Sequence, residues 1–497
     1  MIKRITVGVL FLVSGLIFAQ NERLFPYRIS LTGTTKPSEI TEYFGKPHLA
    51  TSSERYSEDG IALTYKEGDQ IQEFSGFSLD AIPFTSEFGV IIEFKYAMVD
   101  GQTFNGRYGD GMSLFIYDSN KDFEIGAHGA SLGYAYRNNE YETPNVAGLN
   151  GAYLGVGLDV YGDFKTRSIV EHEKREGIWG HNWSEVGSHI TIRGGQLKNN
   201  RYKGYPVLYT INANKKWTIN RARLAYDTGE YDFYEEQGLK TFEMHTGYDV
   251  KGNIKYNKVI VGVTPSAKGG TELEVRVADD RGEGVFIRGL HYPDAFKTFD
   301  QEGNLYNFET TIPANFKIGF AAATAGAYQK HLVKDIVVRL PYEPEMEDLV
   351  VFFCHKKEDN EGRSVDFDVY DDTYFYSGSL TNRPTGGNSS NFVDYTSFRF
   401  EDEEGYAISS NPFKYVEQGV GTWEYDGNRT VVFTAERDDL EKGEYSIYYS
   451  AKGVDKGPNG GPFGEDVYRS RPTKLTVLVD GCKKLINPNL PIKAIVE

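Results

Sequence analysis

The sequence predicts an all-β protein built from β-sandwich domains. Aromatic residues make up 14% of its 497 residues, with 35 Tyr and 31 Phe, and there are 54 Gly. Aromatic side chains favour strands and glycine favours turns. Short apolar runs, such as 89–96, 188–193 and 258–263, alternate with clusters of Gly, Asp and Asn, and convincing amphipathic helices are absent. Many short strands without interleaved helices indicate β-sandwiches, and the length suffices for two or three domains.

The first twenty residues, 1–20, predict a secretory signal peptide. Lys3 and Arg4 precede an apolar stretch, 5–18, that is too short for a comfortable membrane span, and Ala19 is a small residue at a plausible cleavage position. No later apolar run approaches the roughly 18 residues of a transmembrane helix. We therefore expect an exported mature chain without a transmembrane segment, extracellular or at the cell surface, with the periplasm as the other option.

The chain is strongly acidic. Its formal net charge is −17, from 54 Lys and Arg against 71 Asp and Glu. Such a chain is a poor partner for nucleic acid, whose phosphates require a basic patch. The charge suits a secreted protein and the local capture of divalent cations, although a solvated acidic surface accounts for most of it.

Two apolar strands carry carboxylates at one end. The segments are 109–118 and 151–164. Asp110 precedes the first strand, and Asp159, Tyr161 and Asp163 close the second. Because strand side chains alternate between faces, we expect the last three to share one side and to converge with Asp110 at one rim of a sheet. An acidic rim beside aromatics and glycine loops suits calcium, sugar hydroxyls or both.

Four segments in this order resemble the L-type lectin family, also called legume-lectin-like or concanavalin A-like. They are the Asp-Gly that opens the strand of 109–118, the Gly-rich loop 126–135, the Leu-Gly-Val strand of 151–164, and the late segment 316–326 with its Ile-Gly-Phe. The resemblance covers roughly residues 22 to 342, and we assign a lectin-like domain to 21–342. It implies a jelly-roll of two packed antiparallel sheets.

The resemblance also implies a carbohydrate site. Asp110 would follow a cis peptide and accept hydrogen bonds from two sugar hydroxyls, and a backbone amide of Gly129 or Ala130 would donate to the same sugar. The alternatives are that Asp110 caps a turn before its strand and that Gly129 only permits a tight turn.

Other positions of this implied site depart from the family or have a structural alternative. Asp163 stands where the family has an Asn, which removes an amide donor and adds charge. Tyr161 and Tyr328, with His128 as a further candidate, would offer the apolar platform that a sugar ring needs. Tyr161 could instead belong to the core, and Tyr328 could simply be exposed.

The resemblance further implies a metal site beside the sugar. For calcium, Asp159 and Asp163 would give carboxylates and Tyr161 its carbonyl. The family's transition-metal site needs a Glu where this chain has Gly157, so no transition metal is expected there. His189 matches the family's metal histidine, and we interpret it as a structural strand residue. Acids of the intervening loop could supply the missing ligand: Glu171, Glu173, Glu176 and Glu185.

Two further regions organise the chain. Residues 195–256 are polar and rich in Tyr, Lys and Asn, which predicts an insertion on the sandwich, either a surface decoration or a hairpin near the site. The Pro- and Glu-rich joint 341–347 predicts a domain boundary.

Residues 348–497 predict a second, smaller sandwich. Three strand motifs, 417–425, 430–434 and 445–449, resemble CshA-type fibril repeats of bacterial surface adhesins, and the alternative is a generic Ig-like spacer. Cys354 and Cys482 lie near the two ends of this region. Export permits a disulfide between them, worth on the order of 4 kcal/mol for so long a loop, and the alternative is two unrelated buried thiols.

The leading functional hypothesis is a secreted or cell-surface carbohydrate-binding lectin or adhesin without catalytic activity. Its partner would be a glycan or polysaccharide, and several copies or a multimer would supply avidity for a weak sugar site. One alternative is a structural surface module with a degenerate lectin fold. Another is a glycan hydrolase of the glucanase-like sandwich, although no Glu-x-Asp-x-Glu strand is present to pair two carboxylates.

Overall fold

The structure is a computed structural model, and the residues that it describes are 27–44, 55–65, 74–80, 83–87, 89–137, 145–166, 187–213, 221–234, 241–266, 268–300, 303–341, 344–346, 348–354, 364–370, 374–375, 393–403, 405–437, 440–453, 469–470 and 472–480. The chain divides into two compact units, Met1–Pro341 and Tyr342–Glu497. Among the described residues, no helix is long and apolar enough to cross a membrane. The predicted signal peptide, 1–20, lies outside these ranges.

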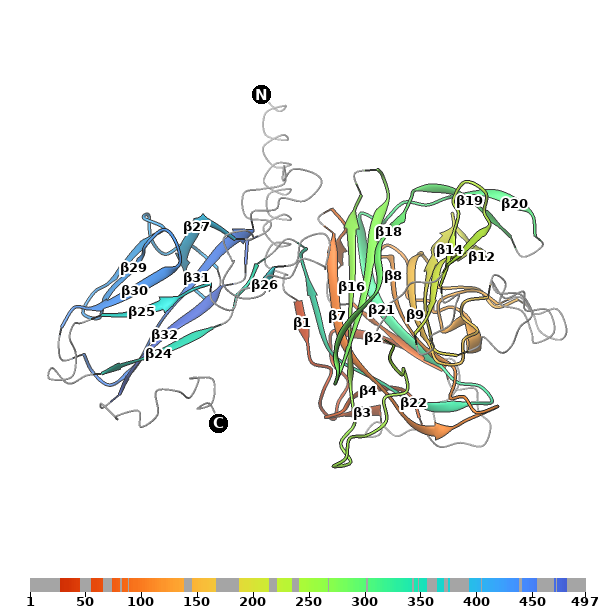
Figure 1. Ribbon diagram of the computed structural model, residues 1–497, viewed down its shortest axis with the longest axis horizontal. Helices are drawn as coiled ribbons and strands as arrows, with labels where there is room; N and C mark the ends of the chain where they lie inside the picture. Colours follow the sequence, from red (N-terminus) through yellow and green to blue (C-terminus); the bar gives the residue numbers. More distant parts are fainter. Residues whose placement is uncertain are drawn as a thin grey trace, which may run out of the picture. The chain divides into compact units, whose positions relative to one another are not determined.

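The first unit contains two large antiparallel sheets (Figure 1). One has eight strands in the order β18-β17-β16-β7-β22-β4-β3, with β1 beside β22. Their bounds are β1 (Tyr27–Ile29), β3 (Tyr56–Ser57), β4 (Gly60–Thr64), β7 (Val90–Gln102), β16 (Asn257–Pro265), β17 (Thr271–Asp279), β18 (Gly282–Tyr292) and β22 (Tyr328–Arg339).

The other sheet has ten strands in the order β15-β14-β13-β10-β9-β8-β21-β5-β2, with β6 beside β21. Their bounds are β2 (Ile40–Phe44), β5 (Phe74–Leu79), β6 (Phe84–Thr85), β8 (Gly111–Asp118), β9 (Ala152–Asp159), β10 (His189–Gly194), β13 (Val207–Asn212), β14 (Arg221–Leu224), β15 (Tyr231–Tyr234) and β21 (Asn315–Ala323). Within 195–256, where we expected an insertion, β13, β14 and β15 extend this sheet at one end.

Two short hairpins complete the first unit. One joins β11 (Gln196–Leu197) to β12 (Asn200–Gly204), and the other joins β19 (Ala295–Phe299) to β20 (Leu305–Glu309).

The central strands of the ten-stranded sheet are buried on both faces. Along β8, Met112, Leu114 and Ile116 belong to the main core, which residues of both sheets form. The alternate residues Phe115 and Tyr117 belong to a second core under the Gly-rich loop. This alternation follows from the two-residue period of a strand. It leaves the strand ends, where Asp110 and Asp159 lie, as the part of these strands that can reach a ligand.

The second unit is a smaller sandwich. Its four-stranded sheets are β24-β32-β31-β27 and β25-β30-β29-β28, and β23 pairs with β26. Their bounds are β23 (Pro344–Glu345), β24 (Leu349–Cys354), β25 (Ser364–Asp368), β26 (Tyr374–Phe375), β27 (Val393–Glu401), β28 (Lys414–Glu417), β29 (Gly421–Tyr425), β30 (Thr430–Ala435), β31 (Gly443–Gly453) and β32 (Thr473–Asp480). One core joins both sheets around the fully buried Trp423. The predicted fold class, an all-β jelly-roll sandwich followed by a smaller one, is confirmed.

The predicted disulfide lies outside what the structure describes. Cys354 is the last residue of β24, and its backbone pairs with that of Asp480 in the parallel strand β32. Cys482 and the side chain of Cys354 are outside the described residues. The disulfide and the likeness of this unit to adhesin repeats both remain predictions.

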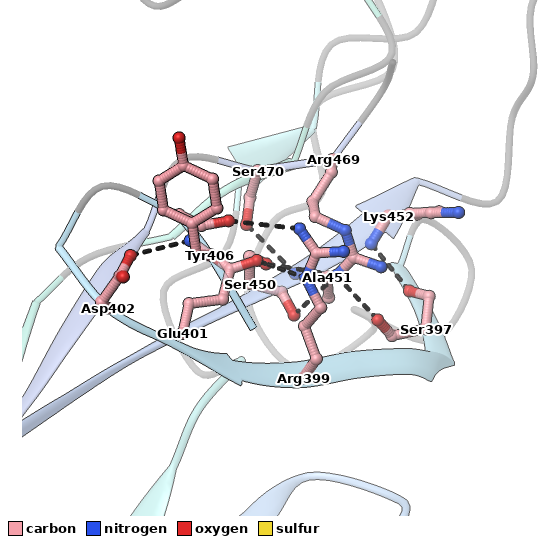
Figure 2. A network of polar contacts seen from close by, with 11 residues as sticks. Ser397, Arg399, Glu401, Asp402, Tyr406, Ser450, Ala451, Lys452, Arg469 and Ser470 are labelled. Atoms are coloured by element: carbon pink, nitrogen blue, oxygen red, sulfur yellow. Dashed lines mark hydrogen bonds and ion pairs between the residues drawn. The ribbon is translucent and has the colours of Figure 1, made fainter. Parts of the chain in front are cut away.

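A polar network around the buried Glu401 links strands of the second unit (Figure 2). Glu401 is 2% exposed, and its Oε1 accepts a hydrogen bond from Arg399 Nε at 2.5 Å and another from the Ser450 hydroxyl. Arg469 Nη1 donates to the carbonyl oxygens of Ser397, at 2.8 Å, and Ser450, at 3.2 Å. The network therefore ties Arg469, which follows β31 in the sequence, to both β27 and β31.

Replacing Glu401 tests how much this network contributes. The change Glu401→Ala leaves the Arg399 guanidinium without its buried counter-charge, and we expect a loss of about 3 kcal/mol of local stability. Native-state hydrogen exchange of peptides from β27 and β31 measures that loss. Glu403→Ala removes an exposed acid of the same unit and should leave exchange unchanged. Equal exchange in the two variants would contradict a stabilising role for the network.

Candidate functional site

Asp110 lies where three segments of the first unit meet. Its peptide bond with Gly109 is cis, as expected. Its amide donates to the Ala323 carbonyl at the end of β21 (2.9 Å), and its carbonyl accepts from the amides of Val160 (3.0 Å) and Tyr161 (3.1 Å). Its side chain is 7% exposed. The backbone of Asp110 thus joins β8, β21 and the chain that leaves β9.

The Gly-rich loop brings Gly129 against the Asp110 carboxylate. A 3-10 turn, η1 (Gly129–Ser131), forms in this loop, and Ser113 Oγ of β8 donates to the Leu132 carbonyl at 2.7 Å. Gly129 has φ +64°, and a methyl group added to it would lie 3.8 Å from Asp110 Oδ2. A larger residue would be strained there and would cover the carboxylate.

The loop also supplies hydrogen-bond donors. The amides of Gly129 and Ala130 are the first two of the 3-10 turn, so they have no partner within it. Neither donates to the backbone of another described residue. The rim thus combines the Asp110 carboxylate with the turn that carries these two amide donors.

The other wall of the rim comes from Tyr161 and the segment before Asp110. Tyr161 is 8% exposed and packs against Ala327, and the Arg107 guanidinium carbon lies 5.8 Å from the centre of its ring. Phe104 is 49% exposed, and a methyl group added to Gly326 would lie 3.9 Å from its ring. The exposed aromatic ring beside the late loop is therefore Phe104.

Tyr328 is bonded to a neighbouring strand. It begins β22, and its hydroxyl donates to Gln102 Oε1 of β7, the next strand of the same eight-stranded sheet, at 3.2 Å. The preceding residue, Ala327, is the one that contacts Tyr161. The structure therefore brings Asp110, Gly129 and Tyr161 together, with Ala130 next to Gly129 in the turn, and it gives Tyr328 a partner on β7.

The expectation that Asp159, Tyr161 and Asp163 share one strand face is wrong. The strand β9 ends at Asp159, and the chain then turns. The amides of Gly162 and Phe164 donate to Asp159 Oδ1 and Oδ2, each at 2.7 Å, and Gly162 has φ +101°. The Asp159 carboxylate, 1% exposed, accepts hydrogen bonds from amides of the residues that follow it. The alternation of side chains between the two faces of the strand therefore stops at Asp159.

Two buried cations, Lys165 after the turn and Arg193 in β10, lie beside this turn. Lys165 is 4% exposed, and its Nζ lies 3.3 Å from His189 Nε2. His189 Nδ1 lies 2.5 Å from the Gly187 carbonyl, so Nδ1 carries the proton and Nε2 accepts from Lys165. Arg193, 2% exposed, donates through Nη1 to the carbonyls of Phe164 (2.7 Å) and Thr166 (3.1 Å).

Opposing effects act on the Asp159 carboxyl. Burial is the largest and, with the neighbouring Asp163 carboxylate, raises the pKa of Asp159 to about 7. The Gly162 and Phe164 amides and the Lys165 ammonium act in the opposite direction. Burial also lowers the pKa of Arg193 to about 10, which leaves this side chain charged at neutral pH.

The described residues do not fit the implied metal ions. Both nitrogens of His189 are engaged, and the position of the missing acid, Gly157, has no room: a methyl group there would lie 2.3 Å from the Phe164 ring. Calcium needs six to eight oxygen ligands. Here the Asp159 carboxylate is near the Lys165 ammonium as well as the Asp163 carboxylate, and no cluster of three metal-binding side chains occurs among the described residues.

The acids expected to complete the metal site cannot be placed. Glu171, Glu173, Glu176 and Glu185 lie outside the described residues.

Two hollows in the first unit lie away from this rim. One, of about 490 Å³, is lined by polar residues such as Asp118, Lys198 and Glu309. The other, of about 240 Å³, is lined in part by aromatic residues, among them Tyr202 and Tyr306. Neither includes Asp110 or Gly129, so the rim at Asp110 is not part of either cavity.

The first unit is thus a two-sheet sandwich that has a carboxylate and a Gly-rich loop at one strand end. Lectins are among the solved structures to which this chain is similar. The VIP36 exoplasmic/lumenal domain, in a form bound to Ca²⁺ and Man3GlcNAc, matches at 13% identity over 63% of this chain and 89% of its own, with a TM-score of 0.31.

Two plant lectins match to the same extent. Lectin II from Ulex europaeus is 9% identical over 63% of this chain and 97% of its own (TM-score 0.33), and the Lotus tetragonolobus seed lectin is 12% identical over 63% and 97% (TM-score 0.32). No protein-family model matches the chain, and no curated protein matches its sequence. At such scores the ligand of this chain has to be inferred from its own side chains.

Sequence reasoning missed four residues that shape the rim: Phe104, Arg107, Lys165 and Arg193. The sequence gives little sign that basic residues belong to the site, because a lone Lys or Arg usually lies on the solvated surface. Lys165 lies two residues after Asp163, and this closeness was the one available sign that the acids have an internal cation.

Removing one acceptor of Asp159 tests the turn. In Asp159→Asn, one side-chain oxygen becomes an amide that cannot accept from Gly162 or Phe164, and we expect a loss of about 2 kcal/mol of unfolding free energy. Urea denaturation of the full chain measures it. Asp227→Asn, at an exposed position, is the matched control. If both variants unfold alike, the carboxylate does not hold this turn.

Proposed function

We propose that this protein is an exported, non-catalytic glycan-binding protein whose first unit holds the sugar at the rim around Asp110. The supporting observation is the Asp110 carboxylate beside Gly129, 3.8 Å from where a methyl group on that glycine would be, in a turn whose first two amides donate to no backbone carbonyl of another described residue. The resemblance of the sequence to L-type lectins agrees with this choice.

The groups at the rim match the chemistry of a sugar. A carboxylate accepts hydrogen bonds from two neighbouring hydroxyls, and such charge-assisted bonds are stronger than neutral ones. The amides of Gly129 and Ala130 would donate to a sugar oxygen. The exposed Phe104 ring would offer an apolar surface to the C–H face of the sugar.

The remaining predicted contacts take lesser roles. Tyr161 is nearly buried and would form the floor rather than a stacking platform. Asp163 is 8% exposed and would act on the site through its charge beside Asp159. Tyr328 would contact a ligand only if the glycan extended toward β7. Calcium is not included, because the described residues do not fit it.

Two alternatives remain as outcomes of the experiment. A retaining glycan hydrolase needs two carboxylates about 5 Å apart, one of them free to exchange protons with the substrate. Asp159 is buried, and its carboxylate accepts hydrogen bonds from two backbone amides, so it is not available to exchange protons with a substrate. The other alternative is a structural surface module that binds no sugar.

The function also has a cellular context. Recognition by one carboxylate and a few amides is weak, so several copies presented together would be needed for firm attachment. Export to the cell surface or beyond would place the protein among polysaccharides. The second unit would then serve as a spacer that presents the first.

Replacing Asp110 tests the site. We expect Asp110→Asn, which keeps the shape but removes the charge, to weaken glycan binding by at least about tenfold, since hydrogen bonds to charged groups contribute roughly 1.5 to 3 kcal/mol. A glycan array with the full mature chain identifies the ligand, and calorimetry gives the affinities. Asp227→Asn is the control.

Each outcome selects one function. Binding by the wild type that Asp110→Asn weakens supports the proposal, provided that both proteins melt at the same temperature. Release of reducing ends from a bound polysaccharide would establish a hydrolase. A folded wild type that binds nothing on the array would leave the structural module.

A further inference from the structure

We propose that the Lys165 ammonium is a built-in cation that takes the place of a metal ion and makes the rim around Asp110 independent of divalent cations. Only the consequence, metal-independent glycan binding, rests on the proposed function. The evidence for the position of the cation is the set of contacts that Lys165, His189 and Arg193 make.

The first observation is where the ammonium lies. Lys165 is 4% exposed, so its charge is withdrawn from water, and its Nζ donates to His189 Nε2 at 3.3 Å. His189 is 1% exposed and stands opposite Asp159 in the pairing of β10 with β9. A buried ammonium requires nearby negative charge. Among the described residues, Asp159 is close enough to interact electrostatically with Lys165, and Asp163 in turn lies close to Asp159.

The second observation is that Arg193 fixes the residues on either side of Lys165. Its Nη1 donates to the carbonyl of Phe164, one residue before, and to that of Thr166, one residue after. Its guanidinium carbon lies 5.2 Å from the centre of the Phe164 ring. These contacts set the backbone of Lys165 and so aim its side chain at His189.

The acids of this cluster carry no surplus negative charge that a metal would have to neutralise. Asp159 and Asp163 supply at most two negative charges, and fewer at neutral pH because the pKa of Asp159 is raised to about 7, against the two positive charges of Lys165 and Arg193; all four residues are at least nine-tenths buried. A divalent ion added to this group would create a net positive charge of at least two in a low-dielectric setting. Buried ions without balanced partners are strongly disfavoured.

The third observation is the space at Gly157. The Phe164 ring fills it so closely that even a methyl group would approach to 2.3 Å. An acidic side chain therefore cannot extend from this position toward His189. The space that a further ligand would need is occupied by a side chain that Arg193 holds in place.

The cluster is connected to the sugar-binding residue. Asp159 ends β9, and the next two amides, those of Val160 and Tyr161, donate to the Asp110 carbonyl. Whatever fixes the turn after Asp159 therefore fixes Asp110. Lys165 is a positioning residue in this account, because it acts on the ligand through the turn and does not touch it.

The experiment compares the full mature wild type with Lys165→Gln and Lys165→Arg. Metal content is measured by mass spectrometry, and melting temperature is measured with EDTA and with millimolar CaCl₂. We expect no bound metal and no shift in the wild type. Lys165→Gln should melt lower and bind glycan about tenfold more weakly, and it should gain stability from added calcium because its two acids lack their cation. Lys165→Arg should recover part of the loss.

Lys251→Gln, which removes an exposed lysine, is the matched control and should resemble the wild type. A stoichiometric metal in the wild type, or a melting temperature that falls with EDTA, would overturn the proposal. So would a Lys165→Gln variant that matches Lys251→Gln. If Lys165→Gln does not fold, the wild-type metal and EDTA measurements still decide. They need no glycan, so failure of the proposed function is distinguished from failure of this inference.

Discussion

The rim depends on the two hydrogen bonds that the Asp159 carboxylate accepts from the amides of Gly162 and Phe164. They end β9 and set the turn whose first amides reach the Asp110 carbonyl. A buried carboxylate is costly unless donors and cations surround it. Lys165 and Arg193 meet that need, and they do so from within the same loop and the neighbouring strand.

The sandwich makes such an arrangement possible because the central strands of the ten-stranded sheet are covered on both faces. Residues of β8 alternate between the main core and the core under the Gly-rich loop, so the loop is held against the sheet by apolar contacts. Gly157 leaves room for the Phe164 ring on the same face. The Asp110 carboxylate and the turn η1 thereby lie at the strand end, beyond these apolar contacts.

Much of this could be predicted from the sequence, since it depends on local pattern. Alternating apolar runs gave the strands, and the Asp-Gly before β8 and the glycines of the loop pointed to the rim at Asp110. The turn after Asp159 could not be predicted, because strand alternation was assumed to continue through Tyr161. The roles of Lys165 and Arg193 depend on partners far away in the sequence, and β13 to β15 joined the main sheet where an insertion was expected.

The central proposal is that a glycan binds at the rim of Asp110 and that the rim needs no divalent ion. The most direct test follows the backbone amide resonances of Gly129 and Ala130 by NMR while a glycan is added in the presence of EDTA. We expect these two amides to shift in a saturable way as the sugar accepts their hydrogen bonds. Shifts confined to other parts of the first unit, or shifts that occur only after calcium is restored, would contradict the proposal.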